Sequence, residues 1–277
     1  MKNLTAGRFT RSLAFALLSA FALGCSTMHS QQIIAHRGAS HDAPENTLAS
    51  FKLGWEQGAD ADELDIWLSK DGRLVVMHDG DTKRITGVNK KIEAQTLAEL
   101  RALDAGAWKG PQWKGEKIPT LDEVLALIPA GKRLFIEIKC GPEVLPELER
   151  VLHDSGRKPA QCAIIAFSFQ VAQQAKRRLP ALEVSWLYDW KKDKDTGLTF
   201  APDELIQKAR RANLDGLDLK YPGPIDAAFV RQVKAAALKL YVWTVDDPAD
   251  AKKAAEAGVD GITTNRPQWL RQQLHAR

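Results

Sequence analysis

Short apolar runs rich in β-branched residues recur along the chain from residue 33 onward, and segments with helical periodicity separate most of them. These runs predict eight β-strands, at Ile33–His36, Asp62–Leu68, Leu134–Lys139, Ala163–Phe167, Val184–Leu187, Gly216–Leu219, Leu240–Val245 and Gly258–Thr263. Regular alternation of strands and helices indicates a parallel sheet. Eight such strands can close on themselves and leave no exposed edge, so the pattern predicts an α/β fold of the (β/α)₈, or TIM-barrel, class. An open doubly wound sheet is the alternative, but no Gly-x-Gly-x-x-Gly motif follows the first strand.

Two of the intervening segments carry clear helix signals. Thr47–Gln57 has apolar residues at helical spacing and stops before Gly58. Thr120 precedes the apolar segment Leu121–Ile128 and is followed three residues later by Glu123, which is the pattern of a capping box.

One feature interrupts the alternation after the second predicted strand. Asp71-Gly72 stands between that strand and a further apolar run at Leu74–His78, which predicts a tight β-hairpin. Residues 79–117 then show weak periodicity and many Lys, Gly and Trp residues. We therefore expect a small insertion at the end of the barrel where functional loops collect, within one domain spanning residues 33–277.

The first 25 residues differ in kind from the rest. Three basic residues and no acidic one open the chain, and residues 13–23 are almost purely apolar. A basic start, a short apolar stretch and an exit of small residues predict a signal peptide over residues 1–25, followed by a linker over 26–32. The residues around Cys25 also resemble a bacterial lipoprotein cleavage box. We expect an exported protein, either periplasmic or attached to a membrane through a lipid on Cys25.

Removal of that segment changes the charge of the chain. The formal net charge is +4, from 39 basic and 35 acidic residues, but three of the basic residues lie in residues 1–25. The mature chain would therefore carry 36 basic residues against 35 acidic ones. A nearly neutral domain has no electrostatic footprint for nucleic acid. The sequence likewise predicts no protein partner.

The other two cysteines are not expected to form a disulfide. Cys140 would follow the C-terminal end of one barrel strand, whereas Cys162 would lie at the N-terminal start of the next. Opposite ends of a barrel are too far apart for the Cα separation of about 4.4–6.8 Å that a disulfide requires.

Three acidic residues lie where the strand pattern turns their side chains inward. Glu63 and Asp65 alternate with apolar neighbours on the second strand, and Glu137 does the same on the third. Carboxylates that converge in this way repel one another unless a cation lies between them. Oxygen ligands alone favour one hard divalent cation, Ca²⁺ or Mg²⁺, over zinc. The alternative is a buried network of charges in which these acids pair with Arg37 and Lys139.

Two histidines flank the predicted carboxylate cluster. His36 ends the first strand, and His78 ends the hairpin strand. Imidazole and imidazolium coexist near neutral pH, so one histidine can accept a proton while the other donates one. Arg37 and Lys139 could contact phosphoryl oxygens. Phosphodiester hydrolysis needs such a pair of histidines, one as a base for the attacking oxygen and one as an acid for the leaving alkoxide.

Five short motifs occur in a fixed order along the chain. They are Ala35-His36-Arg37-Gly38, Pro44-Glu45-Asn46-Thr47, Glu63-Leu64-Asp65, Met77-His78-Asp79 and Glu137-Ile138-Lys139. As an ordered set, they resemble the glycerophosphodiester phosphodiesterase family, over residues 33 to about 267. The resemblance implies a (β/α)₈ barrel with a segment inserted after the second strand, and a divalent cation, usually Ca²⁺ or Mg²⁺. It also implies a small-molecule glycerophosphodiester as substrate, cleaved to an alcohol and sn-glycerol 3-phosphate.

The resemblance carries over to individual residues. Positions that match the family motifs are the metal ligands Glu63, Asp65 and Glu137, the acid/base pair His36 and His78, and the substrate-binding residues Arg37, Lys139, Glu45 and Trp243. We expect His36 to be the base and His78 the acid. Trp243 corresponds to an aromatic wall beside the glycerol. Glu45 either holds Arg37 or orders its loop.

The chain departs from the family pattern on its last strand. The family commonly has Thr-Asp-x-Pro there, whereas this chain has Thr264-Asn265-Arg266-Pro267, which changes the local hydrogen bonding. Two other functions remain open. One is a phosphodiesterase acting on lysophospholipid head groups, in which Trp108, Trp113 and Trp190 could form a rim for the acyl chain. A catalytically inactive envelope lipoprotein is the third hypothesis, and the complete set of acids and histidines argues against it.

Overall fold

The computed structural model describes residues 1–2, 31–191 and 193–275. Almost all of the predicted signal peptide, Cys25 and most of the linker therefore lie outside the described residues. No helix among the described residues is long and apolar enough to cross a membrane.

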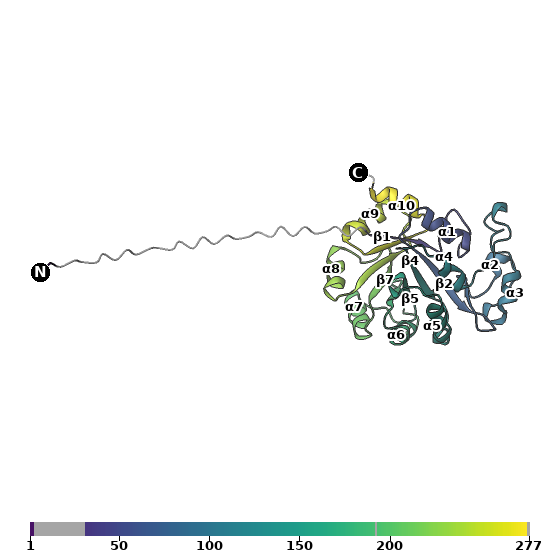
Figure 1. The fold of residues 1–277 in the computed structure, drawn as a ribbon, viewed down its shortest axis with the longest axis horizontal. Helices are drawn as coiled ribbons and strands as arrows, with labels where there is room; N and C mark the ends of the chain where they lie inside the picture. Colours follow the sequence, from purple (N-terminus) through teal and green to yellow (C-terminus); the bar gives the residue numbers. More distant parts are fainter. Residues whose placement is uncertain (3–30, 192, 276–277) are drawn as a thin grey trace.

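Eight parallel strands close into a barrel, as the alternation predicts, and a ninth strand pairs antiparallel with the C-terminal part of the second strand (Figure 1). The strands are β1 (Gln32–His36), β2 (Ala61–Leu68), β3 (Leu74–Val76), β4 (Arg133–Ile138), β5 (Cys162–Ala166), β6 (Glu183–Tyr188), β7 (Gly216–Lys220), β8 (Lys239–Trp243) and β9 (Gly261–Thr264). Their order is β1-β9-β8-β7-β6-β5-β4-β2-β3, and parallel pairing of β1 with β2 closes the ring. The predicted strands are present, with ends displaced by up to three residues.

Helices surround the barrel in Figure 1. The α-helices are α1 (Leu48–Glu56), α2 (Lys83–Thr86), α3 (Leu97–Ala102), α4 (Leu121–Leu127), α5 (Leu145–Asp154), α6 (Phe169–Arg178), α7 (Pro202–Arg211), α8 (Ala227–Ala235), α9 (Pro248–Ala257) and α10 (Pro267–His275). Short 3₁₀ turns are η1 (Ile92–Ala94), η2 (Pro111–Trp113), η3 (Pro142–Val144) and η4 (Pro159–Gln161). The capping box before α4 is confirmed, because the Glu123 carboxylate accepts a hydrogen bond from the Thr120 backbone N–H at 2.9 Å.

The predicted hairpin joins β2 to β3, which pair antiparallel with Ile66 opposite Val76. The segment after β3 carries α2 and α3 to one side of the barrel (Figure 1). It has a small apolar core of its own, formed by Val75, Met77, Ile85, Ile92, Leu100, Ala105 and Ile118. The insertion is thus packed around its own apolar cluster, which gives the side chains of α2 a fixed position beside the barrel.

Polar residues close the N-terminal end of the barrel. Glu183 of β6 accepts hydrogen bonds from Arg133 of β4 at 2.8 Å and from the Tyr241 hydroxyl of β8 at 2.6 Å. Phe135 and Tyr241 pack edge to face above them, with ring centroids 5.0 Å apart. Because this end is filled, the C-terminal ends of the strands are left as the place for a cavity.

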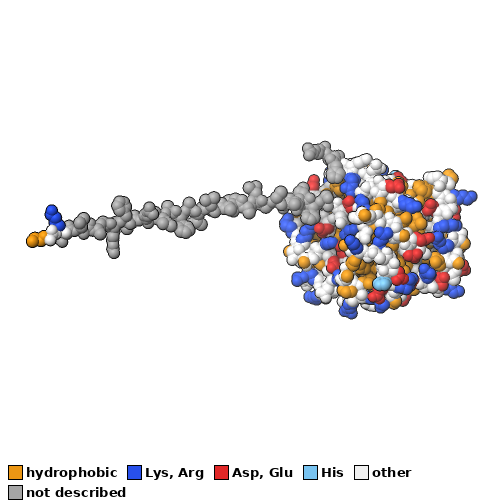
Figure 2. Space-filling model, viewed as in Figure 1, with side chains coloured by type: hydrophobic (Ala, Val, Ile, Leu, Met, Phe, Trp, Pro, Cys, Tyr) orange, Lys and Arg blue, Asp and Glu red, His pale blue; other side chains and the backbone are white. Residues whose placement is uncertain are grey.

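The surface charges are mixed. Figure 2 shows Lys and Arg side chains interspersed with Asp and Glu over the visible face of the barrel. Cys140 and Cys162 are both free thiols.

Asp62 is a buried acid that no functional motif uses. It alternates with Glu63 on β2 and therefore points outward, toward α1, where its side chain is fully buried. Neither carboxylate oxygen has a hydrogen-bond partner among the described residues. A Cβ atom on Gly54 of α1 would lie 2.3 Å from Asp62 Oδ1, so the helix accommodates this acid only because residue 54 is glycine. Burial raises the pKa of Asp62 well above its usual value, against a lowering by Lys132.

We expect Asp62→Asn to stabilise the protein by about 1–3 kcal/mol near neutral pH. The unfolded chain ionises Asp62 above about pH 4, whereas the folded chain must keep it protonated or bury a charge. Stability is therefore lost as pH rises from about 4 toward the raised pKa. Urea unfolding at pH 5 and pH 7.5 should show a larger gain at pH 7.5.

Asp60→Asn is the matched control for this prediction. Asp60 accepts hydrogen bonds from the Ile33 backbone N–H at 2.9 Å and from Arg271 at 2.7 Å, so its neutralisation should destabilise the protein. Equal stability of Asp62→Asn and wild type at both pH values would contradict the prediction.

Candidate active site

A cavity of about 210 Å³ opens at the C-terminal end of the barrel. Its lining residues are His36, Arg37, Glu63, His78, Glu137, Lys139, Ile165, Phe167, Leu187, Asp218, Trp243, Thr244 and Thr263. Most of the predicted site residues are therefore brought together, although they come from five separate segments of the chain. One half of the cavity is charged, and the half formed by β5 to β9 is largely apolar.

The three predicted metal ligands meet beside this cavity. Glu63, Asp65 and Glu137 are all buried, and each offers an oxygen such that the three oxygens lie within 4.8 Å of one another. The pairing of β2 with β4 sets Asp65 directly opposite Glu137. The inward alternation expected from the sequence therefore produces a compact set of carboxylates.

Burial and the proximity of the other carboxylates raise the pKa of two of these groups. Burial, followed by the charges of Asp65 and Glu137, raises the pKa of Glu63 well above its usual value. Burial, followed by the charge of Asp65, raises the pKa of Glu137 to about 7. Burial alone would raise the pKa of Asp65 as well, but Lys139 and Arg37 hold it below its usual value.

Two cations partly balance the cluster. Lys139 Nζ lies 2.7 Å from Glu137 Oε1 and 3.4 Å from Asp65 Oδ1, and Arg37 Nε lies 3.3 Å from Asp65 Oδ2. The buried charge network considered from the sequence is thus present. It does not satisfy every acid, since Asp65 Oδ1 accepts no hydrogen bond from the described residues. Three close carboxylates, one with an unbonded buried oxygen, fit a hard divalent cation.

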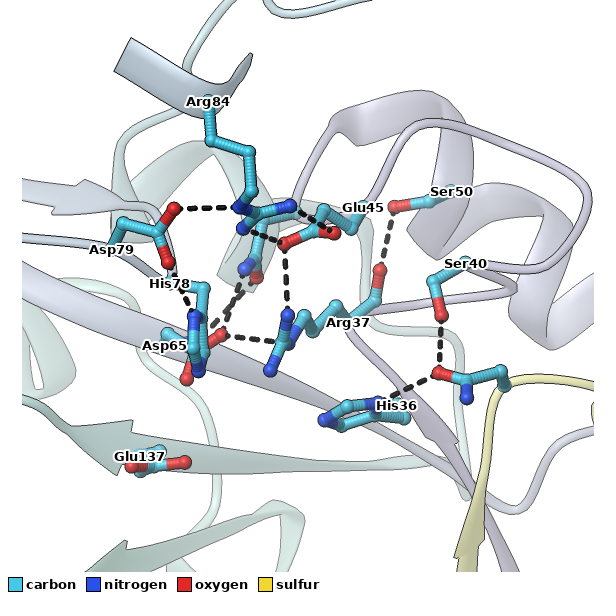
Figure 3. Close-up of polar contacts among 12 residues, drawn as sticks. His36, Arg37, Ser40, Glu45, Ser50, Asp65, His78, Asp79, Arg84 and Glu137 are labelled. Carbon is cyan, nitrogen blue, oxygen red and sulfur yellow. Dashed lines mark hydrogen bonds and ion pairs between the residues drawn. The ribbon is translucent and has the colours of Figure 1, made fainter. Parts of the chain in front are cut away.

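His36 has a neutral partner. Its Nδ1 lies 2.7 Å from the side-chain oxygen of Asn265, which also accepts a hydrogen bond from Ser40 at 2.8 Å (Figure 3). Because an amide oxygen only accepts, Nδ1 carries the proton and Nε2 is left as the acceptor. Burial, followed by the charge of Arg37, lowers the pKa of His36 to about 4. Asn265, which stands where the family commonly has Asp, therefore forms a hydrogen bond to His36 but supplies no negative charge.

His78 has an acidic partner instead. Its Nδ1 lies 2.7 Å from Asp79 Oδ1 (Figure 3). Burial, together with the charges of Lys139 and Arg37, lowers the pKa of His78, although the charge of Asp65 and the hydrogen bond to Asp79 act in the opposite direction. The pKa of both histidines is thus lowered, and they differ in the partner of Nδ1, which is a neutral amide for His36 and a carboxylate for His78.

Glu45 and Arg84 connect the insertion to both sides of the site (Figure 3). Glu45 Oε1 accepts from Arg37 at 2.9 Å, so Glu45 holds Arg37, which is one of the two roles considered for it. Arg84 of α2 donates to both Glu45 oxygens, at 3.0 and 2.8 Å, and to Asp79 Oδ2 at 2.6 Å. One guanidinium therefore braces the partner of Arg37 and the partner of His78.

Several of these contacts join residues that were not predicted from the sequence. Asn46 donates to Asp65 Oδ2 at 2.8 Å, and Arg84, Asn265 and Asp79 hold other site residues as described above. Asn46 and Asp79 stand within recognised motifs, but nothing in the weakly periodic insertion distinguishes Arg84. Asp218 could have been found, because it is the polar residue between two leucines on a predicted strand.

The aromatic residues divide into two groups. Trp243 lies in the cavity wall as expected, edge to face with Phe167 at a centroid distance of 5.4 Å. Trp190 instead packs against Tyr188 and Phe229, and its Nε1 donates to the Lys220 backbone oxygen. Trp108 lies in the insertion with 41% of its surface exposed. Trp108, Trp113 and Trp190 are not among the residues that line the cavity.

Comparisons with known proteins agree with this geometry. The sequence model of the glycerophosphoryl diester phosphodiesterase family matches residues 36–269. A glycerophosphodiester phosphodiesterase of Caldanaerobacter subterraneus subsp. tengcongensis is 38% identical over 244 residues, covering 86% of this chain and 95% of the relative. One from Bacillus subtilis is 31% identical over 252 residues, covering 84% and 83%.

A solved structure is similar over most of the chain. An Oleispira antarctica phosphodiesterase, in complex with the product sn-glycerol-3-phosphate, superposes with a TM-score of 0.79 at 29% sequence identity. The match covers 89% of this chain and 98% of the neighbour.

Proposed function

Because the chain belongs to the glycerophosphoryl diester phosphodiesterase family, we propose that it hydrolyses glycerophosphodiesters to an alcohol and sn-glycerol 3-phosphate with the help of one divalent cation, Ca²⁺ or Mg²⁺. The observation that carries this proposal is that a cluster of three buried carboxylates lies at one cavity together with two histidines whose hydrogen-bond partners differ. The product bound to the Oleispira antarctica neighbour supports the substrate class. The cavity volume of about 210 Å³ lies below the range of about 300–1,000 Å³ usual for larger ligands, which favours a small polar diester.

Glu63, Asp65 and Glu137 would hold the cation. When bound, the cation supplies positive charge that polarises the phosphoryl group. Arg37 and Lys139 border the same cavity and can each donate to a phosphoryl oxygen. Both already lie beside the carboxylates, so a diester bound there would have cationic groups on more than one side.

His36 acts as the general base in this proposal. Its pKa of about 4 leaves the ring neutral at physiological pH, and the hydrogen bond to Asn265 directs Nε2 away from that partner as a free acceptor. Nε2 can therefore take the proton from the attacking oxygen.

His78 acts as the general acid. Its Nδ1–H is held by the Asp79 carboxylate, which stabilises the charged imidazolium in the same way that the acid of a hydrolase triad stabilises its histidine. The proton on Nε2 of that imidazolium can then be given to the leaving alkoxide.

Removal of the cation should abolish activity. We expect EDTA to stop the release of sn-glycerol 3-phosphate from glycerophosphocholine, and Ca²⁺ or Mg²⁺ to restore it, because Arg37 and Lys139 alone only partly offset the repulsion between three carboxylates and an anionic diester. A coupled assay for glycerol 3-phosphate measures both steps. Activity that is indifferent to EDTA would leave the phosphodiesterase proposal standing and refute the cation.

A further inference from the structure

Asp218 is an acid inside the barrel that the proposed mechanism does not use. It lies on β7 between Leu217 and Leu219, whose side chains pack outward into the main core, so the Asp218 side chain points inward. Its side chain lines the cavity and is only 2% exposed. Oδ1 is fully buried without a hydrogen-bond partner, and no ion pair to Asp218 occurs among the described residues.

The position of Asp218 within the ring separates it from the carboxylate cluster. In the strand order of the closed barrel, β7 is four strands from β2 in either direction, so Asp218 faces Glu63 and Asp65 across the barrel. If the phosphate lies at the charged side, with Arg37 and Lys139, an organic part of the diester must point toward β7.

Apolar side chains form most of the wall around Asp218. Ile165, Phe167 and Leu187 line this half of the cavity together with Trp243. The indole Nε1 of Trp243 donates to the Asp218 backbone oxygen at 3.1 Å, which fixes the ring next to β7. The apolar wall offers C–H and aromatic surface but no hydrogen-bond partner for the Asp218 carboxyl group.

A buried carboxyl group without a partner is costly and therefore uncommon in proteins. A ligand hydroxyl removes that cost, because it can both donate to and accept from a carboxyl group. Glycerol joins hydroxyl groups to a short carbon chain whose C–H surface suits the ring of Trp243. An acyl chain would leave Asp218 unpaired.

We infer that Asp218 binds a hydroxyl group of the glycerol moiety and makes the site selective for glycerol over an unsubstituted alkyl group. This inference rests on the proposed function, which places the phosphate against the carboxylate cluster. It identifies Asp218 as a specificity residue that takes no part in the proton transfers.

The test is calorimetric binding to the Ca²⁺-loaded protein of two ligands that differ only in hydroxyl groups, sn-glycerol 3-phosphate and propyl phosphate. We expect Asp218→Leu to weaken binding of sn-glycerol 3-phosphate by about 10- to 100-fold and to leave propyl phosphate unchanged. Asp218→Asn keeps a donor and an acceptor at the site and should bind sn-glycerol 3-phosphate within about 5-fold of wild type. Asp62→Asn is the matched control, since Asp62 is also a buried unpaired acid but points out of the barrel.

Each alternative outcome is distinct. Equal weakening of both ligands by Asp218→Leu, or of neither, would overturn the inference. Phosphocholine is measured as a third ligand. If Asp218→Leu weakened binding of phosphocholine and not of sn-glycerol 3-phosphate, Asp218 would bind a cationic head group and the inference would be overturned. Wild-type protein that discriminates between the two ligands but cleaves no glycerophosphocholine would refute the proposed function and leave the hydroxyl site standing.

Discussion

Glu63→Gln should lower cation-dependent hydrolysis by about a thousand-fold or more and at the same time make the cation-free protein more stable. A bound cation contributes several kcal/mol to the transition state, and each 1.36 kcal/mol corresponds to about a factor of ten in rate. The gain in stability has a separate cause. Glu63 is buried beside two other carboxylates, which raises its pKa, so the folded chain resists its ionisation while the unfolded chain does not. This cost is present above the usual carboxyl pKa and disappears at lower pH.

Two measurements separate these effects. Glycerol 3-phosphate release reports the loss of activity, and thermal unfolding with and without Ca²⁺ reports stability. We expect the variant to melt at a higher temperature than wild type without cation and to gain little when Ca²⁺ is added. Glu56→Gln is the matched control, because Glu56 lies exposed on α1 and should leave both quantities unchanged. Cation-dependent turnover near the wild-type rate in Glu63→Gln would be incompatible with Glu63 as a ligand.

His36→Gln should lower kcat by about 10²- to 10⁴-fold, the range of a lost general base. A pKa of about 4 means that the His36 ring is neutral, with Nε2 unprotonated, throughout the neutral range, so the variant should be equally impaired at every pH above about 6. In the wild type, activity should fall only as the pH approaches about 4, because protonation of Nε2 then removes the base. KM should change less than kcat, since Nε2 acts on the attacking oxygen.

Steady-state kinetics between pH 5 and pH 9 test this prediction. His41→Gln is the control, because His41 is half-exposed in the first loop, lies 2.7 Å from Asp42 and does not line the cavity. If His36→Gln retained most of its kcat, the base would have to be His78 or another group.

The strand pattern alone was enough to place the carboxylates. An inward-facing residue recurs at every second position of a strand whatever the rest of the chain does, so Glu63, Asp65 and Glu137 could be assigned to the inner face from their apolar neighbours. Parallel strands also put their C-terminal ends at one edge, which brought His36 and Lys139 to the same place. The hairpin at Asp71-Gly72 is local in the same sense, because two residues determine the turn.

The partners of those residues depend on distant segments. Asn265 reaches His36 across 229 positions of sequence, and only closure of β1 against β9 brings the two together. Arg84 reaches Glu45 across 39 positions because the insertion folds on its own small core and returns to the barrel. No periodicity encodes such pairs.

Asp62 shows both what local sequence determines and what only the folded chain determines. The alternation on β2 predicts its direction correctly, but its burial without a partner depends on how closely α1 approaches at Gly54. Local sequence therefore determines which way a side chain points, since backbone geometry repeats every two or 3.6 residues. The packing of the whole chain decides what that side chain meets, and with it the pKa values of His36, His78 and the carboxylates, because burial and neighbouring charges are properties of the folded structure.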